Sequence, residues 1–293
     1  MAANLNTMPP KITIVTPSYN QGQFLDDTIQ SVLGQGYPNL EYIVMDGGST
    51  DNSAEIIKKY EKHLAHWVSE KDGGQAAAIN AGFSRATGDI LGWLNSDDMY
   101  LPGALTFAAG RLNAAVPEIV FGNCLHINEH SSESFGSDVV DTRKTKNLKL
   151  YDYIIQPSSF WTKAAWDAAG ALDSAMHFGF DWEWFLRAEK LGISLSPVSK
   201  YLSVYRIHDA HKTGTGGDRR QQELAEVYGR YAGPHYKELY LQCCQRKPEV
   251  ADFQALMARR RLRRLAGPLL RLKFPALYRQ GTIQEIQDLL DMG

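Results

Sequence analysis

The stretch that decides the fold reads Asp-Ile-Leu-Gly-Trp-Leu-Asn-Ser-Asp-Asp, residues 89–98. Its apolar centre has the length of a buried β-strand, and the strand ends in a polar turn that carries Asp97 and Asp98. Three apolar runs of the same kind precede it, at residues 12–16, 40–45 and 66–69. Helical patterns separate the four runs, and this alternation predicts an α/β fold in which helices cover both faces of a mostly parallel sheet.

Polar residues follow the expected strands. Tyr19 and Asn20 come after the first strand, Asp46 ends the second, and Asp97 and Asp98 end the fourth. The carboxyl ends of parallel strands lie at one edge of the sheet, where α/β proteins bind their ligands. We therefore expect these side chains to form a single site, although each cluster taken alone also suits an ordinary turn.

The adjacent carboxylates of Asp97 and Asp98 are the sharpest chemical feature of the sequence. Two carboxylates so close repel each other unless a cation or a proton lies between them. A hard divalent cation, Mn²⁺ or Mg²⁺, prefers oxygen ligands and takes further oxygens from a substrate's phosphates. The pair therefore predicts a metal site that stabilises a departing diphosphate, and the alternative is a solvated turn or a helix cap.

Asp46, Tyr19 and Asn20 are candidates for nucleoside recognition. A carboxylate at a strand end accepts hydrogen bonds from a base or a ribose, as acidic residues do in wound sheets, or it caps the next helix. Tyr19 would stack on the base or pack in the core, and Asn20 would cap the following helix. The sequence contains neither a G-x-G-x-x-G after a strand nor a Walker A pattern, which argues against a dinucleotide oxidoreductase and a P-loop phosphotransferase.

The composition limits the classes of function further. A formal net charge of −2 argues against a general nucleic-acid binder, which needs a basic excess. The cysteines at 124, 243 and 244 provide no disulfide framework, and this fits a reducing cytoplasm. No apolar run reaches the roughly 18 residues of a membrane span, and residues 1–10 are expected to be a disordered lead-in and not a signal peptide.

Four groups of residues occur in an order that resembles the family 2 glycosyltransferases. They are Thr16-Pro17-Ser18-Tyr19-Asn20, Asp46-Gly47-Gly48-Ser49-Thr50-Asp51, Asp72-Gly73-Gly74-Gln75 with Asn80 and Gly82, and Thr87-Gly88-Asp89 through Asn95-Ser96-Asp97-Asp98. The resemblance covers residues 11–210 and implies the GT-A fold, a Rossmann-like sheet flanked by helices. Several motifs in order are specific, whereas each one alone is weak.

The resemblance also implies a role for each matched residue. The nucleoside pocket would be lined by Pro17, Tyr19, Asn20, Asp46 and Asp72. Asp97 would approach the ribose or the metal, and Asp98 would ligate the metal. The family's D-x-D signature is Ser-Asp-Asp in this chain, which leaves open which aspartate is the ligand.

The family places an acidic base in a segment that corresponds here to residues 180–187, and Asp181 matches its position. The family often has Glu just before the base, whereas this chain has Phe180, which makes Glu183 a rival. A carboxylate suits the chemistry, because it takes a proton from the acceptor hydroxyl as the oxygen attacks the anomeric carbon opposite the diphosphate. One such displacement inverts the anomeric centre. Asp181 would otherwise cap its helix, and Arg187 would pair with Glu183.

A histidine-containing segment near the expected end of the catalytic domain, Tyr205-Arg206-Ile207-His208, resembles the region after the last strand of the family. By that resemblance His208 would ligate the metal or touch the diphosphate, and Arg206 would touch the diphosphate. The tryptophans near the expected base provide a platform for the acceptor or pack in the core; they are Trp161, Trp166, Trp182 and Trp184.

The remaining sequence suggests how the chain is divided. We expect a catalytic domain at 11–215, with its nucleotide-binding half at about 11–100 and its acceptor half at about 101–215, and a helical extension at 216–293. Residues 121–143 are expected to form a hairpin or a mobile loop. Residues 257–280 are basic and amphipathic, which favours an anionic membrane surface over a helix packed on the domain or a contact between two copies of the chain.

These features predict an inverting, metal-dependent glycosyltransferase that acts in the cytoplasm or on the inner face of the cell membrane. It would move a sugar from a nucleoside diphosphate, preferably UDP, to a saccharide or polyprenyl-linked acceptor in cell-surface polysaccharide synthesis. A sugar-nucleotide pyrophosphorylase is one alternative, but Asn20-Gln21-Gly22 lacks the basic residues of its loop. A non-catalytic scaffold, the other alternative, would be expected to lack Asp98 or Asp181.

Overall fold

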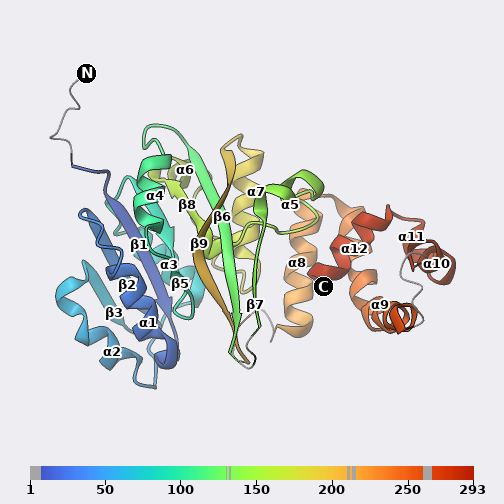
Figure 1. Ribbon diagram of the computed structural model, residues 1–293, viewed down its shortest axis with the longest axis horizontal. Coiled ribbons are helices and arrows are strands. Elements are labelled where there is room, and N and C mark those ends of the chain that lie inside the picture. Colours follow the sequence, from blue (N-terminus) through green and yellow to red (C-terminus); the bar gives the residue numbers. More distant parts are fainter. Residues whose placement is uncertain (1–7, 130, 132, 210–211, 213–215, 260–265) are drawn as a thin grey trace. The chain divides into compact units, whose positions relative to one another are not determined.

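The computed structural model describes residues 8–129, 131, 133–209, 212, 216–259 and 266–293 (Figure 1). The chain forms two compact units, one of residues 1–142 with 154–211 and one of residues 143–153 with 212–293. The short range 143–153 lies inside the expected catalytic domain but groups with the C-terminal helices.

The first unit is built on a nine-stranded sheet with the order β3-β2-β1-β4-β8-β6-β9-β5, and β7 pairs with β6 outside this path. The strands are β1 (Ile12–Ser18), β2 (Leu40–Asp46), β3 (His66–Ser69), β4 (Ile90–Trp93), β5 (Met99–Tyr100), β6 (Glu118–Asn128), β7 (Ser134–Gly136), β8 (Ser159–Thr162) and β9 (Ser194–Ile207). The four strands predicted first are confirmed and are parallel. The rest of the sheet is mixed, because β5, β7 and β8 join it antiparallel.

Helices cover both faces of the sheet, because successive strand residues point to opposite sides. Ile12 and Ile14 of β1 pack with buried residues of α1 (Gly22–Leu33), α2 (Ser53–Lys59) and α4 (Ala104–Arg111). Val15 points to the opposite face of the sheet, toward α3 (Gln75–Phe83). There it packs so close to Gly82 that a side chain at position 82 would not fit. The other helices of this region are α5 (Val139–Thr145), α6 (Lys163–Ala169) and α7 (Phe180–Lys190), with short 3₁₀ turns at Glu61–His63 and Gln156–Ser158.

The prediction for residues 121–143 is only partly right. β6 and β7 do form a hairpin, but β6 is also a long strand that runs beside β9 in the interior of the sheet (Figure 1). The polar residue that obscured this strand is Asn123, which is buried. Its side-chain amide donates to the Ser199 carbonyl and its oxygen accepts from the Val139 backbone, so the strand tolerates it.

The N-terminal lead-in is described only from Met8 onward, and residues 1–7 lie outside the described residues. The carbonyls of Pro9 and Pro10 accept hydrogen bonds from the side chains of Asn39 and Tyr37. The start of the described chain is therefore tied to the turn that precedes β2.

The second unit is helical, as predicted for the C-terminal region. It contains α8 (Gly217–Tyr231), α9 (Pro234–Arg259), α10 (Ala266–Lys273), α11 (Pro275–Tyr278) and α12 (Ile283–Met292). Tyr228 and Tyr240 pack ring against ring in its core, and Lys146 forms an ion pair with buried Asp288.

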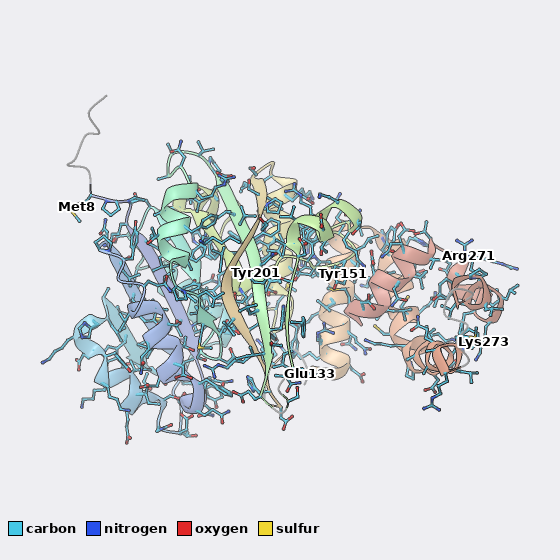
Figure 2. The ribbon with its side chains drawn as sticks, viewed as in Figure 1. Met8, Glu133, Tyr151, Tyr201, Arg271 and Lys273 are labelled. Atoms are coloured by element: carbon cyan, nitrogen blue, oxygen red, sulfur yellow. The ribbon has the colours of Figure 1, made fainter. Side chains whose placement is uncertain are left out.

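The basic segment at 257–280 is described only in part, because residues 260–265 lie outside the described residues. Arg271 and Lys273 are exposed on α10 (Figure 2). No helix within the described part of the chain is long and apolar enough to cross a membrane.

Candidate active site

The turns after β1 and β2 are locked together by Asn20. Its backbone has φ +52°, a left-handed conformation that asparagine adopts more readily than most residues. Its N–H donates to the Ser49 hydroxyl over 2.7 Å, and its side-chain oxygen accepts from the Thr50 N–H over 2.8 Å. The prediction that Asn20 caps the following helix is wrong, because α1 begins at Gly22 without a side-chain cap.

Asp46, at the end of β2, is 1% exposed and is held by its own loop. Its Oδ1 accepts from the Ser49 hydroxyl, and its Oδ2 accepts from the Ser49 N–H and the Ser69 hydroxyl. Ser69 ends β3, so this carboxylate joins the ends of two adjacent strands. Asp46 thus shapes the expected nucleoside pocket through protein contacts.

Asp72 and Tyr19 are the more accessible members of the expected pocket. Asp72 lies beside Gly47, where a Cβ would stand 3.0 Å from its Oδ2, so the glycine allows the two loops to approach. Tyr19 is 62% exposed, and the alternative that it packs in the core is therefore wrong. Pro17 is buried at the end of β1 and fixes the backbone from which Tyr19 projects.

The strand β5 brings Asp97 close to β9, the last strand in the sequence. β5 pairs antiparallel with β9, with Met99 opposite Val204, so the residues just before β5 lie beside the end of β9. The Nε2 atom of His208 lies 3.2 Å from Asp97 Oδ2, although 111 residues separate them in sequence. The His208 ring packs against Phe24 of α1, with ring centroids 4.5 Å apart.

Asp98 follows Asp97 in the same turn and is fully buried. Burial raises the pKa of its carboxyl well above the usual range, and the negative charge of Asp97 raises that pKa further. Among the described residues, its Oδ1 atom has no hydrogen-bond partner. The Thr28 hydroxyl of α1 lies 2.8 Å from the Asp98 carbonyl and 2.9 Å from the Ser96 carbonyl, which fixes the turn from below.

The side-chain types of Asp97, Asp98 and His208 suit a divalent cation that is bound partly by the protein and partly by a substrate. Carboxylate oxygens and an imidazole nitrogen suit Mn²⁺, and Mg²⁺ sites commonly combine one or two carboxylates with substrate phosphates. Within the described ranges no group of three or more His, Cys, Asp or Glu residues forms a metal cage.

Arg206 lies at the same edge but is engaged by protein carboxylates. Its Nη2 lies 2.8 Å from Asp27 Oδ2, its Nη1 lies 3.6 Å from Glu129 Oε1, and its side chain is 10% exposed. The guanidinium also lies over the ring of Phe24, 5.4 Å from its centroid. A diphosphate at this edge would compete with Asp27 for the arginine.

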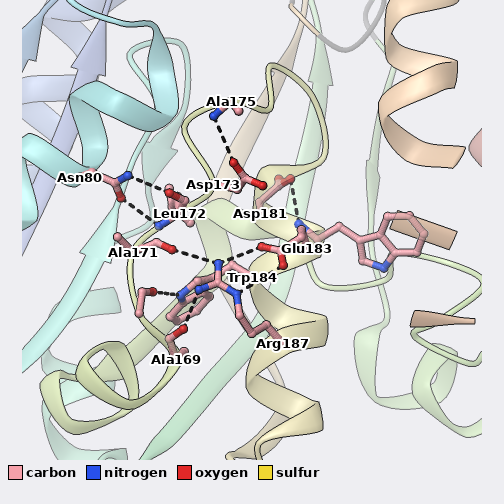
Figure 3. Close-up of polar contacts among 12 residues, drawn as sticks. Asn80, Ala169, Ala171, Leu172, Asp173, Ala175, Asp181, Glu183, Trp184 and Arg187 are labelled. Carbon is pink, nitrogen blue, oxygen red and sulfur yellow. Dashed lines mark hydrogen bonds and ion pairs between the residues drawn. The ribbon is translucent and has the colours of Figure 1, made fainter. Parts of the chain in front are cut away.

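The two candidate bases in α7 have different surroundings (Figure 3). Glu183 is 2% exposed and forms an ion pair with Arg187, with Oε2 and Nη2 2.8 Å apart, as the spacing of four residues suggested. Asp181 is partly exposed in the first turn, and its Oδ1 accepts from the Trp182 N–H. Asp181 is not the helix cap, because Gly179 occupies that position with φ +63°.

Arg187 and Asn80 hold the loop that leads to Asp181 (Figure 3). Arg187 donates to the carbonyls of Ala169 and Ala171 over 2.6 and 2.9 Å. Asn80 of α3 forms a pair of 2.9 Å hydrogen bonds with the backbone of Leu172. The motif residue Asn80 thus acts on the loop before the expected base, a role that the sequence did not reveal.

Comparison with known proteins identifies the family. The model of the glycosyl transferase family 2 matches residues 13–165, more than half of the 293-residue chain. The chain belongs to the family 2 glycosyltransferases. The match includes the ends of β1, β2, β3 and β4 and the candidate residues that follow them, whereas Asp181, Arg206 and His208 lie beyond it.

Curated relatives of this glycosyltransferase agree with that assignment. An uncharacterized glycosyltransferase of Rickettsia typhi is 27% identical over 72% of this chain and 68% of its own length. The putative teichuronic acid biosynthesis glycosyltransferase TuaG of Bacillus subtilis is 38% identical over 31% of this chain and 37% of its own. The chain thus spans about two thirds of the first relative and much less of the second.

Solved structures support the GT-A fold of this glycosyltransferase. S. aureus TarS 1–349 in complex with UDP-GlcNAc matches 96% of this chain and 90% of its own, with a TM-score of 0.61 at 15% identity. The mannosyltransferase PcManGT from Pyrobaculum calidifontis, in complex with GDP-Man and Mn²⁺, matches 96% and 86%, with a TM-score of 0.60 at 16% identity. At these identities the likeness concerns the fold.

The tryptophans of the glycosyltransferase do not form an exposed acceptor platform. Trp161, Trp182 and Trp184 are each at most 1% exposed, and Trp166 is half-buried. Trp161 and Trp184 pack with ring centroids 5.0 Å apart, in a cluster that includes Phe83 of α3. The core interpretation is therefore the right one for these residues.

The Thr87-Gly88-Asp89 motif of the glycosyltransferase lies away from the site, at the amino end of β4. Thr87 donates to buried Glu41 through both its N–H and its hydroxyl, and Asp89 accepts from the Lys11 N–H. A Cβ on Gly88 would stand 2.5 Å from the Thr13 hydroxyl. This motif therefore fastens the start of three strands.

Gln156 is a buried site residue that sequence reasoning missed. It lies in the 3₁₀ turn before β8 and is 5% exposed. Its Nε2 donates to the Trp93 carbonyl, and its Oε1 faces the Asn95 amide. The only available signal was a polar Gln-Pro-Ser-Ser run before an apolar strand, which is also typical of a loop.

Proposed function

We propose that this glycosyltransferase transfers a sugar from a nucleoside diphosphate, preferably UDP, to a saccharide or lipid-linked acceptor with inversion at the anomeric carbon. The observation that carries the proposal is the contact of Asp97 with His208 in front of the buried Asp98. Asp97 and His208, two residues of metal-ligating types, meet there next to Asp98 at the carboxyl edge of the sheet, where wound sheets bind nucleotides.

Asp97, Asp98 and His208 would hold Mn²⁺ or Mg²⁺ together with the donor diphosphate. When bound, the cation supplies positive charge that stabilises the negative charge developing on the leaving diphosphate. Arg206 would exchange its pairing with Asp27 for a phosphate oxygen. That exchange is chemically reasonable because a guanidinium binds carboxylate and phosphate oxygens in the same bidentate manner.

The nucleoside would bind over the loops that follow β1, β2 and β3. Tyr19, which is 62% exposed, would stack on the base, and Asp72 would accept from the base or the ribose. Asp46 would contribute through a remaining lone pair, since its protein partners are hydroxyls and one N–H. Pro17 and Asn20 would fix the loop that carries Tyr19.

Asp181 would act as the base on the acceptor side. Its carboxylate takes the proton from the acceptor hydroxyl, the hydroxyl oxygen bonds to the anomeric carbon, and the bond from that carbon to the diphosphate oxygen breaks with its electron pair. Glu183 is a poor base by comparison, because the guanidinium of Arg187 holds both of its oxygens. A base contribution of about 10² to 10⁴ in rate is typical.

The names of similar proteins support the choice of substrates. The TarS structure contains UDP-GlcNAc, and the PcManGT structure contains GDP-Man with Mn²⁺. TuaG is named as a putative teichuronic acid biosynthesis glycosyltransferase. We infer the same broad class of donor, metal and product for this chain.

The described part of the basic segment supports a membrane-bound acceptor. Leu272 is 76% exposed on α10, between exposed Arg271 and Lys273 (Figure 2). An exposed apolar residue between cations suits an anionic lipid surface, where each basic residue contributes about 1 kcal/mol. This favours attachment to the inner face of the membrane over a contact between two copies.

A thermal-shift screen of nucleotide sugars, with and without Mn²⁺, tests the proposed function, because a ligand that binds only the folded state raises its melting temperature. We expect a UDP-sugar to stabilise the protein more strongly with Mn²⁺ and to be hydrolysed slowly. Asp98→Ala should lose the additional rise in melting temperature that Mn²⁺ produces. Asp167→Ala, a change at an exposed residue of α6, should retain it.

Two results would reject the proposed function, and a third would change the residues assigned to its site. Binding of a sugar 1-phosphate with a nucleoside triphosphate would indicate a pyrophosphorylase. Stabilisation by no nucleotide at all would indicate a non-catalytic scaffold. Wild-type Mn²⁺ dependence in the Asp98→Ala protein would remove Asp98 from the site.

A further inference from the structure

A chain of side-chain amides lies directly behind the candidate metal ligands. Asn95 Nδ2 lies 3.3 Å from Asp98 Oδ2 and 3.4 Å from Gln156 Oε1, so its two N–H bonds can serve both acceptors. The Asn95 Oδ1 atom accepts from Gln75 Nε2 over 2.8 Å. Every donor and acceptor of this amide is therefore matched.

The backbone fixes the direction of the chain of amides. Gln156 Nε2 donates over 2.8 Å to the carbonyl of Trp93 in β4, so its Oε1 must face Asn95. If the Gln156 amide were rotated, two NH₂ groups would face each other and the Trp93 carbonyl would lose its donor. Asn95 is in turn obliged to present an N–H group to Asp98.

The consequence for Asp98 is a single orientation of its carboxylate. Asn95 holds Oδ2, the Thr28 hydroxyl holds the backbone carbonyl, and Oδ1 is left without a hydrogen bond among the described residues. An oxygen that is buried and unsatisfied in this way costs free energy unless a ligand completes it. The Asn95 amide therefore helps to select which oxygen is offered to a ligand, together with the Arg206 backbone, which also hydrogen-bonds to this carboxylate.

We propose that Asn95, fixed by Gln156 and Gln75, is a positioning residue that orients Asp98 toward the bound cation. This inference rests on the proposed function, because it assigns a role in metal binding to residues that do not touch the metal. Groups that hydrogen-bond to metal ligands commonly change metal affinity by about 10- to 100-fold when they are removed. Gln156 lies 61 residues from Asn95 in sequence, so the 3₁₀ turn before β8 contributes to the site.

The test measures the affinity for Mn²⁺ of the full-length protein saturated with UDP, by calorimetry. Gln156→Met keeps the size of the side chain and removes both hydrogen bonds, and we expect about tenfold or greater weakening of Mn²⁺ binding. Gln75→Met removes the more accessible end of the chain of amides and should weaken Mn²⁺ binding by a few-fold. Binding of UDP without metal should be unchanged in both variants.

Gln35→Met is the matched control. Gln35 also donates from a partly buried position to two backbone carbonyls, Ser31 and Leu101, but it contacts none of the amides. Its variant should lose stability without losing Mn²⁺ affinity. If Gln156→Met binds Mn²⁺ as the wild type does, the role is structural and the proposal is wrong.

Two further outcomes are also decisive. If Gln156→Met does not fold, wild-type Mn²⁺ affinity in Gln75→Met contradicts the proposal, and a selective loss in Gln75→Met supports it. If the wild-type protein binds UDP with no dependence on Mn²⁺, the proposed function fails, and the positioning role fails with it. The wild-type measurement therefore separates the two failures.

Discussion

Glu41 offers a quantitative test of how the sheet is held together at the end opposite the site. This carboxylate is 8% exposed and accepts hydrogen bonds from Lys11, from the Thr13 hydroxyl and from both the N–H and the hydroxyl of Thr87. Burial alone would raise its pKa, but these four hydrogen bonds outweigh burial and lower the pKa from 4.5 to about 2. Glu41→Gln removes the charge and keeps the size.

The size of the effect follows from the two pKa values of Glu41. The folded pKa is the lower one, so the ionised carboxylate stabilises the fold above pH 4.5, and this stabilisation is lost as the pH falls through about 2. A difference of about 2.5 units, at about 1.36 kcal/mol per unit, sets an upper limit of about 3.4 kcal/mol at pH 7. The same relation gives about 1.4 kcal/mol at pH 3.

Urea unfolding followed by tryptophan fluorescence measures the difference in unfolding free energy between the wild type and Glu41→Gln. We expect a loss of about 2 to 3 kcal/mol at pH 7, which shrinks by about 2 kcal/mol at pH 3. Glu61→Gln, a change at an exposed residue, should show little difference at either pH. If the difference in unfolding free energy between the wild type and Glu41→Gln is the same at both pH values, the electrostatic reasoning is refuted.

Two further predictions concern the acceptor side and the packing of α3. Asp181→Asn should lower the transfer rate by about 10² to 10⁴ and leave donor binding unchanged. Glu183→Gln should mainly lower the urea midpoint, because it breaks the ion pair with Arg187. Loss of transfer in Glu183→Gln at full stability would make Glu183 the base. Gly82→Val should lower the unfolding free energy by about 2 to 3 kcal/mol, because even a Cβ would stand 2.5 Å from a methyl group of Val15, and an unchanged urea midpoint would contradict that packing.

The first half of the fold could be predicted because each strand there is a short apolar run that ends in a turn residue. Ile12, Leu40 and Ile90 begin strands within one residue of their expected positions. The second half could not be predicted in the same way. β6 contains Gly122 and Asn123, whose suitability for a strand depends on hydrogen bonds to β9 and α5 that local sequence does not encode.

The site residues divide along a similar line. Asp97 and Asp98 carry their chemistry in their own side chains and end a strand, so sequence alone could place them. Asn80 and Gln156 act through partners 92 and 61 residues away, at Leu172 and Asn95. No spacing rule connects such residues, because tertiary packing brings them together.

The pairing of β5 with β9 has a consequence for how the protein is made. The contact of Asp97 with His208 closes a loop of 111 residues, and contacts between such distant residues form late in folding. A growing chain on the ribosome that has already completed β1 to β4 still lacks His208. Under the proposed function, newly made protein would acquire metal-linked donor affinity only after β9 has emerged and paired with β5, and nucleotide sugar would then selectively stabilise finished molecules.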